Sequence, residues 1–198
     1  MPSLATPETA AAPVSDAVLI RRIGERQAEA LQELYRRHAP NLLALGKRIL
    51  GAVEDAEEVL QEVFLRVWQE PLRYNPERSS VSTWLVLIMR SRAIDRLRNR
   101  RVVERAHGAA YQEAGDSYTS PEGVENVLDR QREGRVRSEL LGLPAEQRQA
   151  LEMAFFEGLT QSEISEKTGI PLGTVKTRTL LAMKKLRKNL RQEIRELL

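Results

Sequence analysis

The sequence has no cysteine, and its only histidines are His38 and His107. The lack of cysteine excludes a disulfide framework, a thiolate metal site and a cysteine nucleophile, and it fits a reducing compartment. Neither histidine has the spaced carboxylates that would complete a metal site. A phosphate-binding glycine loop and a nucleophile elbow are absent as well. We therefore expect a cytoplasmic protein that is not an enzyme and has no cofactor.

Long apolar runs are also missing. No stretch approaches the roughly 18 apolar residues that a membrane-spanning helix needs. Residues 1–15, MPSLATPETAAAPVS, lack the basic start and apolar core of a signal peptide. We expect a soluble chain without membrane insertion and with a disordered tail over residues 1–15. With 198 residues, of which 41% are hydrophobic, the chain can bury one or two modest cores.

Charge is distributed unevenly, although the formal net charge is only +3. Residues 90–101 contain six arginines and one aspartate, and residues 172–198 contain eight basic and two acidic side chains. Residues 51–70, by contrast, contain six acidic side chains and one arginine. The distribution predicts two basic surfaces and one acidic helix.

Helical periodicity dominates the chain, which predicts an all-α fold without a sheet. The pattern divides the chain into a helical domain over residues 16–101, a flexible linker over 102–127 and a second helical domain over 128–198. The linker contains scattered glycines and serines and one proline, and its length permits both compact and extended arrangements.

Within the first domain, the apolar stripe of residues 28–50 predicts a helix with a kink or break at Pro40. Asp55 and Glu58 have the spacing of a capping box, and they precede the buried stripe Ala56, Leu60, Val63 and Val67. For residues 83–101 we expect arginines on one face and an apolar face made by Trp84, Leu87, Ser91 and Ile94.

Residues 159–188 have the spacing of a helix-turn-helix. Gly169 can adopt the left-handed conformation that ends the first helix, and Pro171 cannot extend that helix. The second helix has an apolar stripe that includes Val175, Ala182 and Met183, and a preceding helix with Phe155 and Phe156 is expected to pack behind the motif. The start of the second helix presents hydroxyls and cations suited to phosphates and base edges in the major groove: Thr174, Lys176, Thr177 and Arg178.

Four blocks of sequence occur in a recognisable order. They are ALQELYRRHAPNLLALGKRIL, the acidic DAEEVLQEVFLRVW, STWLVLIMRSRAIDRLRNRR and, after the linker, LPAEQRQALEMAFFEGLTQSEISEKTGIPLGTVKTR. With these blocks the chain resembles the extracytoplasmic-function (ECF) sigma factors of the sigma-70 family. The resemblance implies a factor that binds core RNA polymerase and directs promoter-specific initiation. It also implies control by an anti-sigma factor.

The resemblance assigns roles to the two domains. Residues 16–101 correspond to sigma region 2, which docks on polymerase and reads the −10 element as melted strand, and residues 128–198 to region 4, which reads the −35 element as duplex through the helix-turn-helix. Polymerase binding falls to Asp55, Glu57, Glu58, Gln61, Glu62 and Phe64, of which Phe64 is equally well explained as a core residue. Reading of the −10 strand falls to the polar loop residues Asn75, Arg78, Ser79 and Ser80 and to a positive track of Arg90, Arg92, Arg96 and Arg98.

Several points remain open from the sequence. Trp84 can stack on a base or pack in the core, and Asp95 is expected to orient a neighbouring arginine. Leu180 and Leu181 stand where the family often has a polar or basic residue, so base preference is undetermined. A helix-turn-helix regulator and an interaction protein that mimics a sigma factor are the alternative functions. The oppositely charged acidic helix and C-terminal helix also predict that the two domains attract each other in the free protein.

Overall fold

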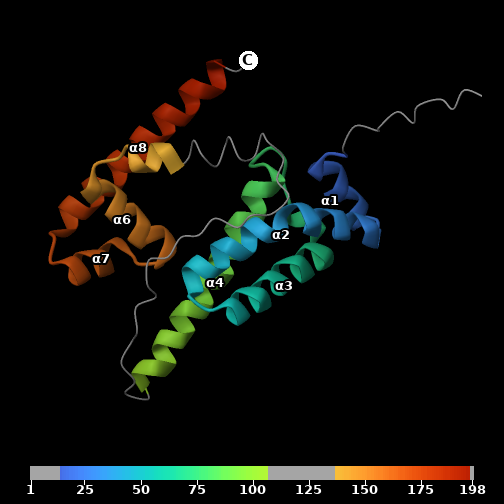
Figure 1. Cartoon of the computed structure of the whole chain (residues 1–198), viewed down its shortest axis with the longest axis horizontal. Helices are drawn as coiled ribbons and strands as arrows, with labels where there is room; N and C mark the ends of the chain where they lie inside the picture. Colours follow the sequence, from blue (N-terminus) through green and yellow to red (C-terminus); the bar gives the residue numbers. More distant parts are fainter. Residues whose placement is uncertain (1–13, 107–136, 197–198) are drawn as a thin grey trace, which may run out of the picture.

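The structure is a computed structural model that describes residues 14–106 and 137–196. These residues form two groups of helices, α1 to α4 and α6 to α8 (Figure 1), and contain no strand, so the predicted all-α class is confirmed. The predicted tail up to residue 13 and the predicted linker from residue 107 onward lie outside the described residues. None of the helices in the described part is long and apolar enough to cross a membrane.

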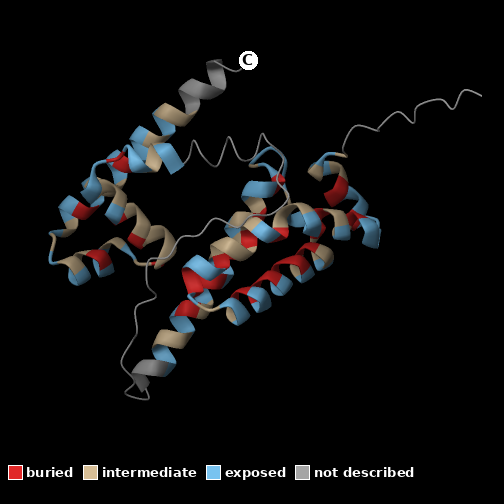
Figure 2. Cartoon of the chain, viewed as in Figure 1, coloured by how far each residue is buried: buried red, intermediate tan, exposed pale blue. Residues whose placement is uncertain are grey.

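The N-terminal domain consists of α1 (Asp16–Gly24), α2 (Ala28–Leu50), α3 (Val53–Gln69), the short 3-10 helix η1 (Pro71–Arg73) and α4 (Val81–Ala106). Its core lies where α2, α3 and α4 pack together, and the buried sides of these helices face one another (Figure 2). Helix α4 continues beyond residue 101, where we expected the linker to begin.

The apolar stripe predicted for α3 is confirmed, because Ala56, Leu60, Val63 and Val67 are all at most 3% exposed. The stripe predicted for α4 is correct at Ile94, which is buried, and wrong at Leu87, which is 55% exposed, and at Ser91, which is exposed. Besides Ile94, the buried residues of α4 repeat every four positions, at Val81, Leu85, Met89, Ala93 and Leu97. Side chains four residues apart lie on one face of a helix, and the small Ala93 in this row lets α4 approach its neighbours closely.

Two local predictions for the N-terminal domain are also corrected. Of the kink or break predicted at Pro40, the break is wrong: helix α2 runs through Pro40, where its packing along both α3 and α4 outweighs the backbone hydrogen bond that proline removes. The first residues of α3 contain no side-chain cap, and the N-cap position is Ala52. Asp55 does not cap the helix, because its carboxylate pairs with Arg96 and Arg100 of α4.

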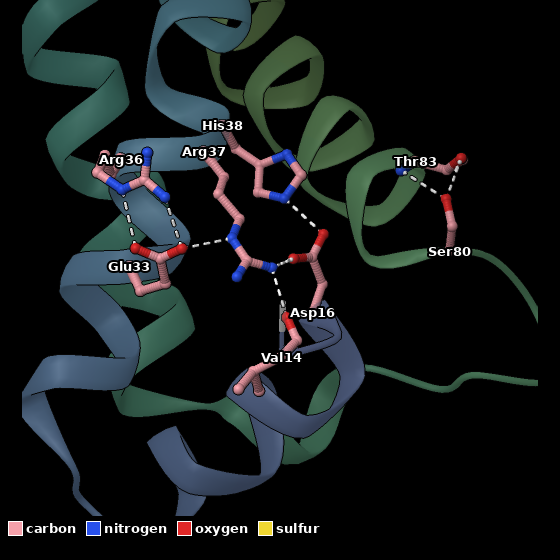
Figure 3. Close-up of polar contacts among 8 residues, drawn as sticks. All are labelled: Val14, Asp16, Glu33, Arg36, Arg37, His38, Ser80 and Thr83. Atoms are coloured by element: carbon pink, nitrogen blue, oxygen red, sulfur yellow. Dashed lines mark hydrogen bonds and ion pairs between the residues drawn. The ribbon is translucent and has the colours of Figure 1, made fainter. Parts of the chain in front are cut away.

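A polar network joins α1 to α2 (Figure 3). Asp16 accepts hydrogen bonds from Arg37, at 2.9 Å, and lies 2.7 Å from Nε2 of His38. Arg37 also donates to the backbone oxygen of Val14 and to Glu33. These contacts lower the pKa of Asp16, and the hydrogen bond to His38 is the largest cause. The hydrogen bonds from Arg36 and Arg37 lower the pKa of Glu33 to about 2.

We expect Asp16→Asn to destabilise the N-terminal domain by about 1–2 kcal/mol at neutral pH, because a charge-assisted contact of a carboxylate that is only 26% exposed is lost. A carboxyl whose pKa is lower in the folded state stabilises the fold above its ordinary pKa, here 3.8, and this contribution disappears as the pH falls through the folded-state value. Urea unfolding between pH 3 and pH 7, followed by tryptophan fluorescence, checks both points. An unchanged acid dependence in Asp16→Asn would contradict the assignment.

The described part of the C-terminal domain contains α6 (Ala145–Phe156), α7 (Gln161–Thr168) and α8 (Leu172–Glu196), preceded by a helical segment at residues 137–141. Its small core joins one buried residue from each of α6, α7 and α8, Met153, Ile164 and Val175, with Leu159 and Ile170 packed against them. Gly169 has a φ of 68°, which confirms the left-handed helix end predicted from the sequence. Met183 was expected in the buried stripe of α8 but is exposed.

Candidate DNA and polymerase surfaces

The reading-helix surface, formed by Thr174, Lys176, Thr177 and Arg178, lies in the first turns of α8. The backbone oxygen of Pro171 accepts hydrogen bonds from Thr174 and Val175, which starts the helix. Val175 is buried in the domain core and fixes the rotation of α8, so that its neighbours point outward. Thr174, Lys176 and Thr177 are exposed, and Arg178 is half-buried. Lys176 and Arg178 make no ion pair within the described part of the chain.

The turn before α8 is firmly held. Thr160 and Glu163 form a capping box at the start of α7: the Thr160 hydroxyl accepts from the Glu163 amide, and the Glu163 carboxylate accepts from the Thr160 amide. The Ser165 hydroxyl donates to the backbone oxygen of Ile170 across the turn, at 2.6 Å. The capping box is visible in the sequence as Thr-Gln-Ser-Glu, but we had assigned such a box only to α3.

The loop between η1 and α4 contains the four polar residues predicted to read a melted strand. Asn75 Oδ1 accepts from the Glu77 amide, and the Tyr74 hydroxyl donates to the backbone oxygen of Ser79. Ser80 Oγ accepts from the Thr83 amide at the start of α4 (Figure 3). Asn75, Arg78 and Ser80 are nevertheless exposed, so the loop has a defined shape and an accessible polar edge. Trp84 is half-buried against the domain core, with its ring 5.5 Å from that of Tyr74.

The arginines of α4 do not form one continuous track, because they lie on two faces of the helix. Arg92 and Arg96 are four residues apart and point to α3, where Arg96 pairs with Asp55 and Glu58 and Arg92 lies 4.0 Å from Glu62. The contact with Glu58 is the largest cause that raises the pKa of Arg96. The carboxylates that orient Arg96 therefore come from α3, whereas Asp95 makes no ion pair among the described residues.

The second face of α4 contains Arg90 and Arg98. Their guanidinium groups donate to backbone oxygens at the end of α6 and in the turn that follows it. Arg90 is half-buried, and burial is the largest cause that lowers its pKa. The four arginines predicted to bind the melted strand therefore contact two different parts of the protein: Arg92 and Arg96 contact α3, and Arg90 and Arg98 contact the C-terminal domain.

The acidic surface predicted to bind polymerase lies along α3. Glu57, Glu58, Gln61 and Glu62 are exposed and Asp55 is half-buried. Phe64, which we also assigned to this surface, is only 5% exposed and packs against Tyr35, with ring centroids 4.7 Å apart. Leu60 and Val63 are buried as well. Leu60, Val63 and Phe64 are therefore core residues. Any effect of Phe64 on polymerase binding would act through the packing beneath the acidic surface.

Comparison with known proteins adds to this geometry. The sigma-70 region 2 family matches residues 34–102, and the sigma-70 region 4 family matches residues 133–186. The ECF RNA polymerase sigma factor RpoE of Cereibacter sphaeroides is 34% identical over 177 residues, which cover 87% of this chain and 93% of that protein. The chain belongs to the ECF RNA polymerase sigma factors.

A second relative agrees with this membership. The sigma factor SigK of a Mycobacterium species, strain KMS, is 31% identical over 164 residues, which cover 81% of this sigma factor and 83% of SigK. Among solved structures, Rhodobacter sphaeroides SigE in complex with the anti-sigma ChrR is similar, with 31% identity, a TM-score of 0.45 and coverage of 89% of this chain and 98% of that one. The sigma-family resemblance inferred from the four sequence blocks is confirmed.

The acidic face of this sigma factor also contains one exposed apolar residue that was not predicted from the sequence. Leu65 is 55% exposed and follows Glu57 and Gln61 at four-residue intervals, so the three residues form a row along the outer side of α3. Glu57 and Gln61 make no hydrogen bond or ion pair within the described residues. Leu65 lies outside the predicted buried stripe of Ala56, Leu60, Val63 and Val67. This position in the helical pattern indicates from the sequence alone that Leu65 is exposed.

Proposed function

We propose that this sigma factor binds core RNA polymerase through α3 and reads its promoter in two places. The reading-helix surface contacts the −35 element as duplex, and the loop before α4, with the arginines of that helix, holds the −10 element as melted strand. The observation that carries the proposal is the start of α8, where Lys176 and Arg178 project without ion-pair partners among the described residues from a rigid helix-turn-helix.

The geometry supports different DNA targets for the two domains. A helix whose first turns present hydroxyls and cations suits the major groove. A loop with exposed amide, guanidinium and hydroxyl groups at Asn75, Arg78 and Ser80 suits the edges of an unpaired base. Arginines beside that loop suit a single-stranded backbone. Trp84 is half-buried behind the loop, where it supports the shape of the site.

Run-off transcription with purified core polymerase tests the function. Promoter fragments are first selected from genomic DNA by the reconstituted holoenzyme and sequenced. Initiation at the selected sites only when both core enzyme and factor are present is the expected result. A helix-turn-helix regulator would bind the fragments without core enzyme, and a sigma mimic would bind core enzyme without starting transcription.

The row of Glu57, Gln61 and Leu65 is the proposed centre of the polymerase surface. We expect the double variant Glu57→Lys, Gln61→Lys to bind core polymerase about tenfold more weakly, because charge complementarity is reversed at an interface. These two positions are preferable to Glu58 and Glu62, whose carboxylates lie against Arg96 and Arg92. Reversing the charge there would disturb the packing of α3 on α4 at the same time.

The measurement is a pull-down titration with core enzyme, with circular dichroism to confirm the fold. A matched control is Glu29→Lys, Gln32→Lys on α2, which changes the same residue types at exposed positions of another helix. Equal binding by both double variants would remove α3 from the polymerase surface. We further propose that an anti-sigma factor binds this protein, as the anti-sigma ChrR binds Rhodobacter sphaeroides SigE.

A further inference from the structure

The two domains meet at a contact that the charge pattern did not predict. Arg90 of α4 donates two hydrogen bonds to the end of α6, from Nε to the Phe155 oxygen at 3.0 Å and from Nη2 to the Ala154 oxygen at 2.8 Å. Arg98 donates to the Gly158 oxygen at 2.8 Å, and Arg101 donates to the Glu157 oxygen. Across the domain contact, α4 therefore meets the end of α6 and the turn after it, and among the described residues no ion pair joins α3 to α8.

A helix end is a chemically suitable partner for these arginines. The last four carbonyl groups of a helix have no acceptor role within it, and the helix dipole makes this end negative. The three arginines follow one another at intervals of eight and three residues, so they lie on one face of α4. They supply from the other domain the hydrogen bonds that a C-terminal cap would supply locally. The hydrogen bond from the Thr160 amide is the largest cause that lowers the pKa of Glu163, and the nearby charges of Arg98 and Arg101 lower it further.

Apolar contacts complete the junction. Ile94 lies between Arg90 and Arg98 on the same face, and it occupies the space beside Gly158, where an added Cβ would lie 2.5 Å from Ile94 Cγ2. Phe156 packs against the core of the N-terminal domain, with the Arg48 guanidinium 3.6 Å from the centre of its ring. Phe155 and Phe156 were predicted to pack behind the helix-turn-helix, but neither belongs to the core formed by Met153, Ile164 and Val175.

We propose that the free sigma factor has a closed state in which the end of α6 and the turn after it occupy the Arg90, Ile94 and Arg98 face of α4. Closure is a property of the free chain and does not depend on what the protein binds. Its consequence rests on the proposed function: Arg90 and Arg98 are half of the predicted track for melted strand, and in the closed factor both guanidinium groups are engaged by the C-terminal domain, although the Arg98 side chain is otherwise exposed. Separation of the domains on polymerase releases them.

The first experiment measures closure without DNA. Because the chain has no cysteine, nitroxide labels can be placed by Gln32→Cys on α2 and Ser162→Cys on α7, both exposed. Double electron–electron resonance on the free protein then reports the distance between the domains. The expected result is a narrow distribution, and a broad one in the wild-type protein would overturn the proposal.

Two glycines provide a matched pair of variants. Gly158 and Gly169 both have left-handed backbones, with φ of 66° and 68°, but an added Cβ collides with Ile94 at Gly158 and meets nothing within 4 Å at Gly169. Gly158→Ala and Gly169→Ala therefore cause similar backbone strain, while only the first disturbs the junction. We expect the distance distribution to lengthen and broaden in Gly158→Ala and to stay narrow in Gly169→Ala. Equal opening in both would overturn the proposal.

Phe156→Ala is a second way to open the junction, because this ring packs on the opposite domain and lies outside the core of its own. Circular dichroism identifies any variant that fails to fold, and at least one opened variant is then compared with wild type. Fluorescence anisotropy with a mixed-sequence single strand of about 20 nucleotides measures access to α4. If the free protein is open about one-tenth of the time, full opening strengthens strand binding about tenfold.

The outcomes separate closure from function. Open variants that bind the single strand no better than wild type would overturn the masking of Arg90 and Arg98, even if the distances confirm closure. Run-off transcription with the unlabelled wild-type protein tests the proposed function separately, because polymerase opens the factor in that assay. Failure there, together with a narrow distance distribution, would overturn the promoter-reading function and leave the closed state in place.

Discussion

Replacing Gly46 with leucine is expected to unfold the N-terminal domain at much lower denaturant concentrations than wild type. Gly46 is buried in α2, where an added Cβ would lie 2.3 Å from Cε of Met89 in α4 and 3.1 Å from Cβ of Ala56 in α3. Three helices therefore meet at a position without a side chain. Met89 ends in a flexible methyl group that can move, but Ala56 has no such freedom and its Cα is only 3.5 Å away.

We expect Gly46→Leu to cost about 3 kcal/mol or more, because overpacking forces the backbones of α2 and α3 apart. Gly46→Ala should cost much less, since the movement of Met89 is partly offset by the better helix propensity of alanine, worth about 1 kcal/mol. Trp68 and Trp84 both lie in the N-terminal domain, so tryptophan fluorescence during urea unfolding reports this domain alone. Gly173→Leu, at a helical glycine with nothing within 4 Å, is the matched control. Equal unfolding midpoints for Gly46→Leu and wild type would show that the helices do not pack as described.

The sequence predicted helices well where an apolar stripe coincided with a chemical signal at the helix end. In α7, glycine at position 169 and proline at 171 set the end of one helix and the start of the next, and both features are local. The stripe of α3 was also correct, because its acidic residues leave only one face that can be buried. Local chemistry of this kind does not depend on which other helix packs nearby.

The stripe of α4 was wrong because that helix offers apolar residues on more than one side. Val81, Leu85 and Leu87 are similar in hydrophobicity, but Val81 and Leu85 are buried and Leu87 is exposed, because the neighbouring helices cover only one side of α4. The same limit applied to Phe155 and Phe156. Their periodicity fits a helix packed behind the helix-turn-helix, whereas their contacts are with Arg90 and Arg48 of the other domain.

The candidate sites show the same division. The apolar stripe that contains Val175 correctly predicted which positions at the start of α8 are exposed. The apolar stripe of α3 likewise predicted that its acidic face is exposed. The partners of the α4 arginines could not be predicted from the sequence, because a run of arginines does not show which carboxylate or carbonyl each one contacts. Arg96 meets Asp55 and Glu58, while Arg90 and Arg98 meet the end of α6. Only the placement of α4 between α3 and the C-terminal domain separates the two groups.

The double variant Lys176→Ala, Arg178→Ala is expected to abolish promoter recognition by the holoenzyme. Both side chains project from the first two turns of α8 and are not engaged in ion pairs with the described residues. A good base contact is worth about 1–3 kcal/mol of discrimination, so loss of two is expected to weaken specific binding by about 30-fold or more. Loss of phosphate contacts alone would weaken binding to every sequence by the same factor and reduce its salt dependence.

The measurement compares holoenzyme binding to a selected promoter and to a version with a scrambled −35 element, over a range of salt concentrations. Arg187→Ala is the matched control, because this exposed arginine lies on the same side of α8 as Lys176 but about three turns further along. A larger loss on the intact promoter than on the scrambled one assigns base reading to the start of α8. Equal losses would assign Lys176 and Arg178 to the phosphate backbone, and wild-type binding by the double variant would move the −35 contact away from this helix altogether.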